Sequence, residues 1–303
     1  MKNKKKNFIF AIGFFVGLSI LLYPMISSRW NAYRAGRLLS SYRETVQENT
    51  NQEEYDRQLA AAREYNKTIQ QESVPDAFSI RDGVQDDEYD SMLTVGEDGL
   101  MGSIEIPAIG ETLPIYHYTT GESLEKGVGH LFGSSLPVGG GGTHAILSAH
   151  RGLPSAKLFT DLPLLEDGDV FYLHILGNTL AYEVDQKLTV EPHEVSALAI
   201  TEGKDYVTLI TCTPYAVNSH RLLVRGHRVD FVQEQYEKLR SEPAKKDVVQ
   251  IWMQILCVCI GLLIAFIIVG VVNFREKRRI GADATEGKKG RVKKGKTKQT
   301  EHE

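Results

Sequence analysis

The chain has 303 residues, enough for one to three folded domains, and its 42% apolar and 24% charged residues exclude a wholly disordered chain. The formal net charge of −4 averages over unlike regions, because residues 1–7 carry four Lys and no acid, and residues 275–303 carry 11 Lys and Arg against 5 acids. The remaining 8–274 holds 20 basic and 34 acidic residues, a net of about −14, and this argues against nucleic-acid binding, which needs a basic face.

The first predicted element is a membrane-spanning helix over 8–26, preceded by a cytoplasmic N-terminus, 1–7. The run FIFAIGFFVGLSILLYPMI has 19 residues without a charge, and a helix needs about 20 to cross a bilayer. A cleaved signal peptide is the alternative interpretation. The residues that follow, Ser-Ser-Arg-Trp at 27–30, offer no convincing small-x-small cleavage site, so we expect the helix to be retained as an anchor.

The region 28–73 is polar, with a few Leu and Ala residues among many charges and without proline, which favours helix in one or two pieces. Asparagines near 48–51 suggest a break between two helices. We interpret this region as an extracytoplasmic helical stalk. The next stretch, 74–90, has six acids, one proline and little periodicity, which is typical of an ordered loop or a linker.

Residues 91–234 have the pattern of a mainly β domain. Short runs rich in Val, Ile, Leu, Thr and Tyr alternate with Gly, Pro and Asp turns, at 102–106, 113–116, 145–149, 169–176, 179–190, 206–212 and 221–232. The tetrapeptide Leu-Gly-Asn-Thr at 176–179 predicts a hairpin turn. Seven or eight short strands in a domain of this size predict a barrel or a sandwich.

A second membrane-spanning helix is predicted over 251–272, a run of 22 uncharged residues, followed by a basic cytoplasmic tail, 273–303. Each apolar run has its Lys and Arg cluster on the side nearer the chain terminus: before the first run and after the second. The positive-inside rule then places both termini in the cytoplasm. The middle, 28–247, must therefore lie outside the cell membrane. The lysines of the tail predict either binding to anionic lipid or a merely solvated charge run.

The use of cysteine points to one unusual thiol. Cys257 and Cys259 fall inside the second apolar run, where Cys behaves as a small apolar residue. Cys212 is therefore the single extracytoplasmic cysteine and cannot form an intrachain disulfide there. An unpaired thiol on the oxidising side is either a catalytic nucleophile or a buried structural residue.

The surroundings of Cys212 favour chemistry. Cys212 ends the predicted strand 205–212, because Pro214 follows, and an eight-residue loop leads to a strand beginning at Arg221. If the two strands pair as a hairpin, Cys212 and Arg221 face each other with Cβ atoms about 5 Å apart. A guanidinium there lowers the pKa of the thiol and can hold an oxyanion. A surface cation on an edge strand is the alternative for Arg221.

A cysteine nucleophile also needs a proton partner, usually histidine. His150 ends the apolar run 145–149 and so lies at a strand rim, whereas His130, His144 and His220 have weaker local context. Spacing alone does not decide between a catalytic and a structural role for His150. The sequence has no Cys and His pairs at zinc spacing and no EF-hand loop, so neither a metal nor another cofactor is predicted.

Two segments resemble the sortase family. VTLITCTPYAVNSHRLLVRGHRV at 207–229 resembles the signature in which Thr-Leu-x-Thr-Cys precedes the catalytic Arg by about nine residues, and THAILSAHRGLPSAKLFTDL at 143–162 resembles the segment that carries the sortase histidine. These long motifs, and the second membrane span, are similar to class C, pilin-polymerising sortases of Gram-positive bacteria. The resemblance covers about 90–234 and implies an eight-stranded sortase barrel.

The resemblance also implies roles for individual residues. Cys212 is the implied nucleophile, His150 the acid and base, and Arg221 the clamp for oxyanion and substrate, while Thr211 is implied to help bind the sorting motif. A sortase cleaves an LPxTG-like signal between Thr and Gly, forms a thioacyl enzyme and passes the acyl group to an amine, in pilus assembly a lysine of the next pilin. The implied partners are proteins with such a signal, an amine acceptor and membrane lipid.

Class C sortases usually carry a lid with an Asp-Pro-aromatic motif. The matching place here is the loop 74–90, which begins VPDAF, so Ala77 stands where proline is expected. We hypothesise that Asp76 forms a salt bridge with Arg221 while Phe78 covers the nucleophile or the adjacent groove. A solvated acidic linker is the alternative.

Three other functions compete with pilus polymerisation. A sortase that anchors surface proteins to a peptidoglycan amine would give single adducts with a pilin instead of ladders. A hydrolytic cysteine peptidase would not divert its product to an added amine. A membrane-tethered binding protein with an incidental thiol would keep its activity after Cys212→Ala.

Overall fold

The computed structural model describes residues 2–48, 52–69, 76–78, 86–95, 99–245, 255–256, 258–272, 274–275 and 278. The chain divides into two compact units, Met1–Phe15 with Asp247–Glu303, and Val16–Lys246. Several sequence expectations fall outside the described residues: most of the lid loop (74–75 and 79–85), the start of the second apolar run (251–254) and nearly all of the basic tail, including 281–303.

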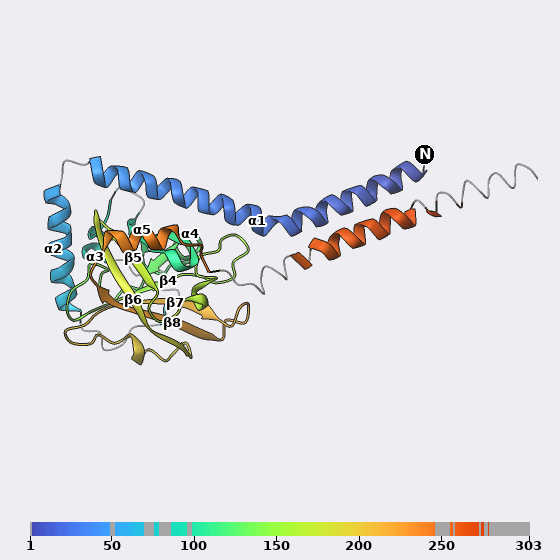
Figure 1. Ribbon diagram of the computed structural model, residues 1–303. Coiled ribbons are helices and arrows are strands. Elements are labelled where there is room, and N and C mark those ends of the chain that lie inside the picture. The colour runs from blue at the N-terminus through green and yellow to red at the C-terminus, as the bar shows by residue number, and fades with distance from the viewer. Residues whose placement is uncertain are drawn as a thin grey trace, which may run out of the picture. The chain divides into compact units, whose positions relative to one another are not determined.

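Eight strands form a closed barrel in the order β1-β2-β3-β4-β7-β8-β6-β5 (Figure 1). The pairs β2–β3 and β4–β7 are parallel and the other neighbours are antiparallel, so the barrel is mixed. The strands are β1 (Leu100–Ile106), β2 (Glu111–His117), β3 (Val128–His130), β4 (Thr143–Ser148), β5 (Val170–Ile175), β6 (Asn178–Val190), β7 (Asp205–Thr213) and β8 (His220–Val229). The predicted mainly β barrel of eight strands is confirmed.

Local sequence explains the turn between β5 and β6. Leu176 and Gly177 link β5 to β6 with φ of 45° and 81°, and positive φ at both central residues is what a two-residue hairpin turn requires. This turn lies one residue before the predicted one. The strand β3 was not among the predicted runs, because three residues that include a glycine carry no alternation.

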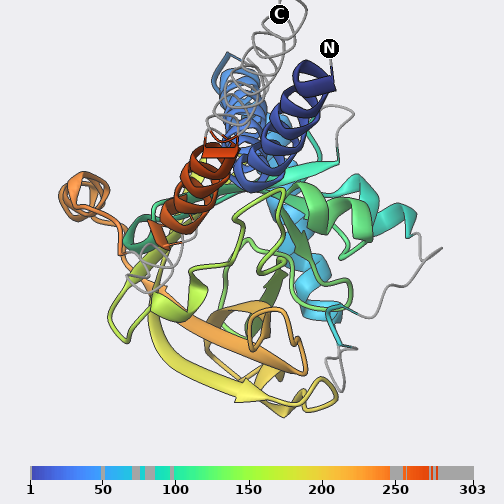
Figure 2. The same cartoon turned by 90° about the vertical axis from the view of Figure 1, so that its right-hand side faces the viewer.

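Short helices connect the strands, precede the first strand or follow the last one. They are α3 (Asp87–Ser91), α4 (Gly121–Lys126) and α5 (Gln233–Ser241), with 3-10 turns η1 (Pro107–Ile109), η2 (Leu162–Leu164) and η3 (Ser196–Leu198). Figure 2 shows the barrel after a 90° turn, with α2 (Gln52–Thr68) and α5 on different sides of it.

The helical character predicted for 28–73 is seen in α1 (Lys2–Glu48) and α2, and the boundary falls where asparagines suggested a break. Both helices pack on the barrel rather than standing apart as a spacer. The buried hydroxyl of Tyr42 donates to the Met101 carbonyl at 3.1 Å and accepts the Leu176 amide at 3.0 Å. From α2, the main core takes Tyr55, Leu59 and Ala62.

Among the described residues, one helix is long and apolar enough to cross a membrane, Ile12–Gln47 within α1. The apolar helix Val258–Val272 is shorter, and it lies inside the run predicted as the second span. The large apolar side chains of both helices are exposed, with Phe15 at 64% and Phe266 at 78%.

Two buried contacts fix the chain on either side of Asp76–Phe78. Before it, the Asn66 side-chain amide donates to the Leu136 carbonyl at 3.0 Å and accepts the Leu136 amide at 2.7 Å. After it, the fully buried Tyr89 hydroxyl lies 2.7 Å from His130 Nδ1. The segment between Asn66 and Tyr89 is therefore attached to the barrel at both ends.

A carboxylate on the barrel wall holds the C-terminal helix α5. Glu105 of β1 accepts the Tyr236 hydroxyl at 2.8 Å and pairs with Arg240 Nε at 2.8 Å, and it lies 3.3 Å from His174 Nε2. The Tyr236 ring packs edge-on against Tyr172 at 4.8 Å between centroids. Helix α5 is thus fixed to β1 and β5 by charge and by aromatic packing.

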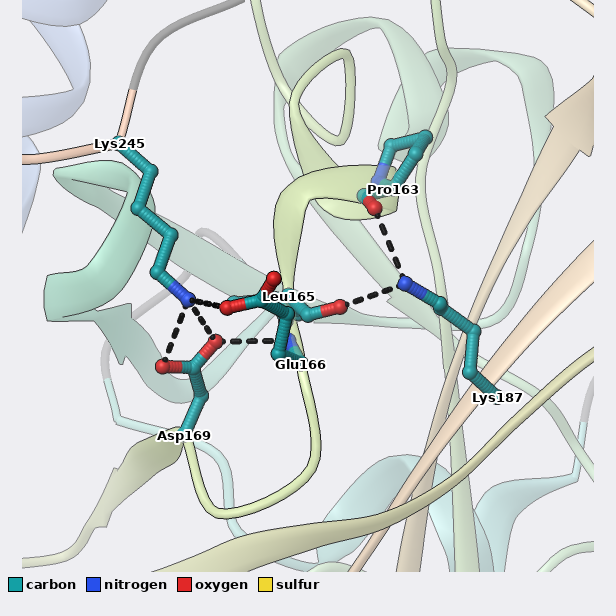
Figure 3. Close-up of polar contacts among 6 residues, drawn as sticks. All are labelled: Pro163, Leu165, Glu166, Asp169, Lys187 and Lys245. Carbon is teal, nitrogen blue, oxygen red and sulfur yellow. Dashed lines mark hydrogen bonds and ion pairs between the residues drawn. The ribbon is translucent and has the colours of Figure 1, made fainter.

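The chain after α5 returns to the barrel through Lys245 (Figure 3). Its ammonium pairs with Glu166 at 2.9 Å and with Asp169 at 2.8 Å, and its backbone amide donates to the Ala108 carbonyl at 2.7 Å. Beside this cluster, the Lys187 ammonium donates to the backbone carbonyls of Pro163 and Leu165, which lie just before Glu166 in the chain.

Candidate active site

The site begins with the antiparallel pair β7–β8. Their register places Cys212 directly opposite Arg221, so the pairing predicted from the hairpin pattern is confirmed. Alternation points Thr211 inward and Cys212 outward on the wall. The thiol-bearing residue is nearly covered, with 9% of its surface exposed.

His150 reaches the same place from the neighbouring parallel strand. The last paired residues of β4 and β7 are Ser148 and Ile210, and His150 and Cys212 each follow two residues later. The Ala149 amide donates to the Ile210 carbonyl at 3.1 Å, which carries the alignment past the end of β4. Two strand ends that run in the same direction thus deliver both predicted catalytic side chains to one rim of the barrel.

Thr211, implied by the resemblance to help bind the sorting motif, lies inside the barrel wall. Its side chain is fully buried, and its hydroxyl donates to the Ala149 carbonyl at 2.8 Å. This bond joins the residue before Cys212 to the residue before His150. In this structure Thr211 therefore ties the two strand ends together and presents no exposed group to a ligand.

Asp76 of the predicted lid pairs with Arg221. Nε and one terminal nitrogen of the guanidinium each donate to a different carboxylate oxygen at 2.8 Å. Two parallel charge-assisted hydrogen bonds are the strongest geometry available to this pair of groups. The remaining terminal nitrogen of Arg221 donates to the Asn218 and His220 carbonyls at 3.2 Å.

Phe78 lies between the other predicted groups. Its ring centroid is 5.6 Å from that of His150, and the Arg221 guanidinium carbon lies 5.1 Å from it. Ala77, where a lid proline was expected, is buried at 2% exposure. It packs with apolar residues on the outer side of the barrel wall, namely Leu131, Ile146, Leu198, Ile210 and Leu223.

The surroundings of Cys212 and His150 shift the pKa values of the thiol and the imidazole in opposite directions. Burial raises the pKa of Cys212, the Arg221 cation opposes this, and the Asp76 carboxylate adds to it, so that the pKa is raised overall. Burial lowers the pKa of His150 despite the charge of Glu125. A thiol with a raised pKa and an imidazole with a lowered one both favour the uncharged form near neutral pH.

The comparisons with known proteins agree with this geometry. A family model described as the sortase domain matches residues 104–229. Sortase C of Streptococcus pneumoniae is 44% identical in sequence, and the match covers 65% of this chain and 98% of that chain with a TM-score of 0.61. The chain belongs to the sortase family. Its similarity to class C members extends to sortase C1 of Streptococcus agalactiae, at 44% identity over 65% of this chain and 96% of that chain, with a TM-score of 0.59.

Curated sortases of other kinds are also similar to this one. Sortase D of Bacillus subtilis is 32% identical over 131 residues, which are 42% of this chain and 63% of that protein. Sortase A of Bacillus anthracis is 32% identical over 130 residues, 43% of this chain and 60% of that protein. The sortase described here thus spans less than two thirds of the curated relatives it matches.

The other histidines that the sequence singled out have structural partners in this sortase. His130 is fully buried between Tyr89 and the Ser135 carbonyl, and burial lowers its pKa to about 4. His144 is held by the Thr208 hydroxyl at 2.7 Å. Within the described residues, no group of three or more His, Cys, Asp and Glu side chains could hold a metal ion.

Sequence reasoning missed Arg151, which follows the histidine. Its Nη1 donates to the Thr213 hydroxyl at 3.1 Å and its Nε to the Thr160 carbonyl at 3.3 Å. The guanidinium carbon also lies 5.9 Å from the Tyr215 ring centroid. Arg151 therefore links the segment after His150 to the segment after Cys212. Its position beside His150 in sequence was the one available signal.

Proposed function

We propose that the chain is a membrane-anchored cysteine transpeptidase that polymerises pili. The observation that carries the proposal is the convergence of Cys212, Arg221 and His150 at one rim of the barrel, beneath Phe78. The similar class C sortases support polymerisation, since sortase C of Streptococcus pneumoniae has been described with regard to pilin substrate specificity.

The proposed reaction exchanges one amide for another. The Cys212 thiol gives its proton to His150, and the resulting thiolate attacks the Thr carbonyl carbon of an LPxTG-like signal. A C–S bond forms, and the carbonyl electron pair moves to oxygen, where Arg221 stabilises it. Collapse of this intermediate breaks the C–N bond, and protonated His150 gives its proton to the leaving glycine amine. A pilin lysine then loses a proton to His150, attacks the thioester carbon and expels the thiolate.

In this proposal the lid, Asp76–Phe78, holds the enzyme in a resting state. Asp76 occupies the guanidinium edge formed by Nε and Nη2, the edge that would face an oxyanion, and its charge raises the pKa of the nucleophile. Phe78 lies against the imidazole. Displacement of the lid by substrate would free Arg221 and lower the pKa of Cys212 in the same movement.

The proposed location is the cell membrane, with the barrel outside and both termini in the cytoplasm. The apolar helix within α1 supports the first anchor. The helix Val258–Val272, inside an uncharged run of 22 residues, supports the second. The basic clusters between each apolar run and its nearer chain terminus support this orientation.

The test is mass spectrometry of Cys212 after incubation of the full chain with an LPxTG-type peptide. We expect an acyl adduct of the peptide cleaved after Thr, and none with Cys212→Ala. An Asp76→Ala, Phe78→Ala variant runs alongside, so that a closed lid does not hide the reaction. A missing adduct in the lid variant would overturn the proposal.

A second incubation, with a pilin that carries the signal, decides the acceptor. Ladders of linked pilin support polymerisation, whereas single adducts with a peptidoglycan amine indicate an anchoring sortase. Release of the free acid even with excess added amine would indicate a hydrolytic peptidase.

A further inference from the structure

Helix α1 carries an exposed stripe of one aliphatic and two aromatic residues where its apolar run ends. Ile26, Trp30 and Tyr33 lie four and three residues apart and so share one face of the helix, and they are 65%, 60% and 58% exposed. The Trp30 and Tyr33 ring centroids are 6.1 Å apart. Together with Arg29, these three residues line an open hollow on the helix.

The same stretch of α1 is basic, unlike the rest of the outer region. Residues 27–43 contain four Arg and no acid, whereas 8–274 as a whole has a net charge of about −14. Basic residues are disfavoured on the extracytoplasmic side of a membrane span, so these arginines require an explanation. Trp and Tyr gather where a helix leaves the hydrocarbon core, and Arg attracts anionic headgroups.

The loop that follows His150 contacts α1 beside this stripe. The Ser155 carbonyl accepts the Asn31 side-chain amide at 2.8 Å and the Ser27 hydroxyl at 3.3 Å. Ser27 and Asn31 each follow a stripe residue by one position, about 100° round the helix. The helix therefore turns one face toward the barrel and leaves the stripe on a separate face.

The contacted loop is the one that begins at His150. The Phe159 amide donates to the His150 carbonyl at 3.1 Å, which closes the loop at its base, and Ser155 lies near its tip. Asn31 is five residues beyond Ile26, about 7.5 Å along the helix. An interfacial layer of a bilayer is roughly 5 to 8 Å thick, so Ser155 would lie at headgroup level.

We propose that the stripe Ile26, Trp30 and Tyr33, with Arg29, binds the phospholipid headgroup layer and thereby holds the His150 loop at the membrane surface. The proposal rests on the proposed membrane anchoring and adds an orientation to it. The catalytic rim would face polypeptide that emerges directly from the bilayer, so a sorting signal placed close to a substrate's own membrane segment could reach Cys212 without leaving the surface.

The first test measures the depth of Trp30 in the full chain reconstituted in phospholipid vesicles. The sequence has two tryptophans, so Trp252→Phe leaves Trp30 as the single emitter. We expect stronger quenching by lipids brominated near the headgroup than by lipids brominated near the chain end, and weak quenching by aqueous iodide. Quenching by iodide without quenching by either lipid would overturn the proposal. A matched control adds Trp30→Phe and Glu202→Trp to the Trp252→Phe chain, which moves the single emitter to the far end of the barrel. This control should show quenching by iodide only.

The second test follows the His150 loop itself. A fluorophore on Pro154→Cys, in a chain with its three native cysteines changed to Ala, should be quenched by headgroup-labelled lipid, whereas the same fluorophore on Glu202→Cys should not. Removing both donors with Ser27→Ala and Asn31→Ala should reduce the quenching at 154 and leave the depth of Trp30 unchanged. Equal quenching at 154 and 202 contradicts the orientation. None of these readouts needs turnover, so a failure here is distinct from a failure of acyl transfer.

Discussion

The Asp76 carboxylate and the Arg221 guanidinium, 145 residues apart in sequence, meet in two parallel hydrogen bonds of 2.8 Å. Their side chains are 20% and 12% exposed, so water screens the pair only in part. The pairing places the anion where a reaction intermediate would develop negative charge. In the proposed function, the Asp76 carboxylate therefore imitates the negative charge of the intermediate.

Removing only the charge of Asp76 tests its effect on the nucleophile. Since the carboxylate raises the pKa of Cys212, Asp76→Asn should shift the midpoint of thiol alkylation to lower pH and raise the alkylation rate at neutral pH. The measurement is the pH dependence of iodoacetamide labelling. Asp185→Asn is the matched control, because Asp185 pairs with Arg225 in the same two-point manner away from the thiol. An unchanged midpoint in Asp76→Asn would falsify the electrostatic role of the lid.

Removing the cover of His150 should act on the imidazole. Burial lowers the pKa of His150, and Phe78 is packed against its ring, so Phe78→Ala should raise that pKa toward its ordinary value of 6.5. Titration of the histidine ring protons by NMR checks this, with His150→Gln to assign the signal. The buried His130 should keep its lowered pKa in the same spectra, and a parallel shift there would mean a general loosening of the barrel.

Arg151 should act as a positioning residue. Arg151→Ala removes the link to Thr213, and a misplacement of catalytic groups by about 1 Å can reduce a rate roughly 100-fold. We expect a fall in the rate of acyl transfer of about tenfold or more, with the pH midpoint of Cys212 alkylation unchanged. Thr213→Val should show part of the same loss, and the double variant should lose little more. Fully additive effects would indicate that the two residues act separately.

The docking of α5 should depend on pH through Glu105. Burial opposes ionisation of Glu105, but its bonds with His174 and Tyr236 and the charge of Arg240 outweigh this, so that its pKa is lowered. Because the pKa of Glu105 is lower in the folded state than its ordinary value of 4.5, ionised Glu105 stabilises the fold at pH values above 4.5. This stabilisation is lost as the pH falls through the pKa of the folded state. Glu105→Gln should cost about 1 to 3 kcal/mol at neutral pH and progressively less below pH 4.5, measured by thermal unfolding. A constant difference across this range would contradict the ionic contribution.

Sequence pattern predicted the parts of the site that depend on strand periodicity. Cys212 and Arg221 could be paired because two alternating runs with a short loop leave few registers, and His150 could be chosen because it ends an apolar run. The parallel pairing of β4 with β7, in which Thr143 lies opposite Asp205 and Ser148 opposite Ile210, was not predicted, because nothing in the local pattern identifies a parallel neighbour so far away in the chain.

Other features could not be read from local pattern. The packing of α1 and α2 on the barrel rests on a few contacts such as Tyr42 with Met101 and Leu176, and a polar helix gives no sign of its partner. The family resemblance implied that Thr211 helps bind the sorting motif, and its hydrogen bond to the Ala149 carbonyl could not be read from the sequence, because it joins two strand ends far apart in the chain. The Arg151 bridge joins two loops and has no periodicity to reveal it.

Asn66 and Tyr89, which are both held to the barrel, lie on either side of Asp76 in the chain, so an Asp76 displaced from Arg221 would remain tethered near it. A group tethered in this way competes for its site at an effective concentration on the order of millimolar. A sorting peptide that diffuses freely at a lower concentration would therefore be excluded by simple competition. A substrate gathered beside the enzyme in the same membrane could exceed this threshold, so the lid would select substrates by their local abundance as well as by their sequence.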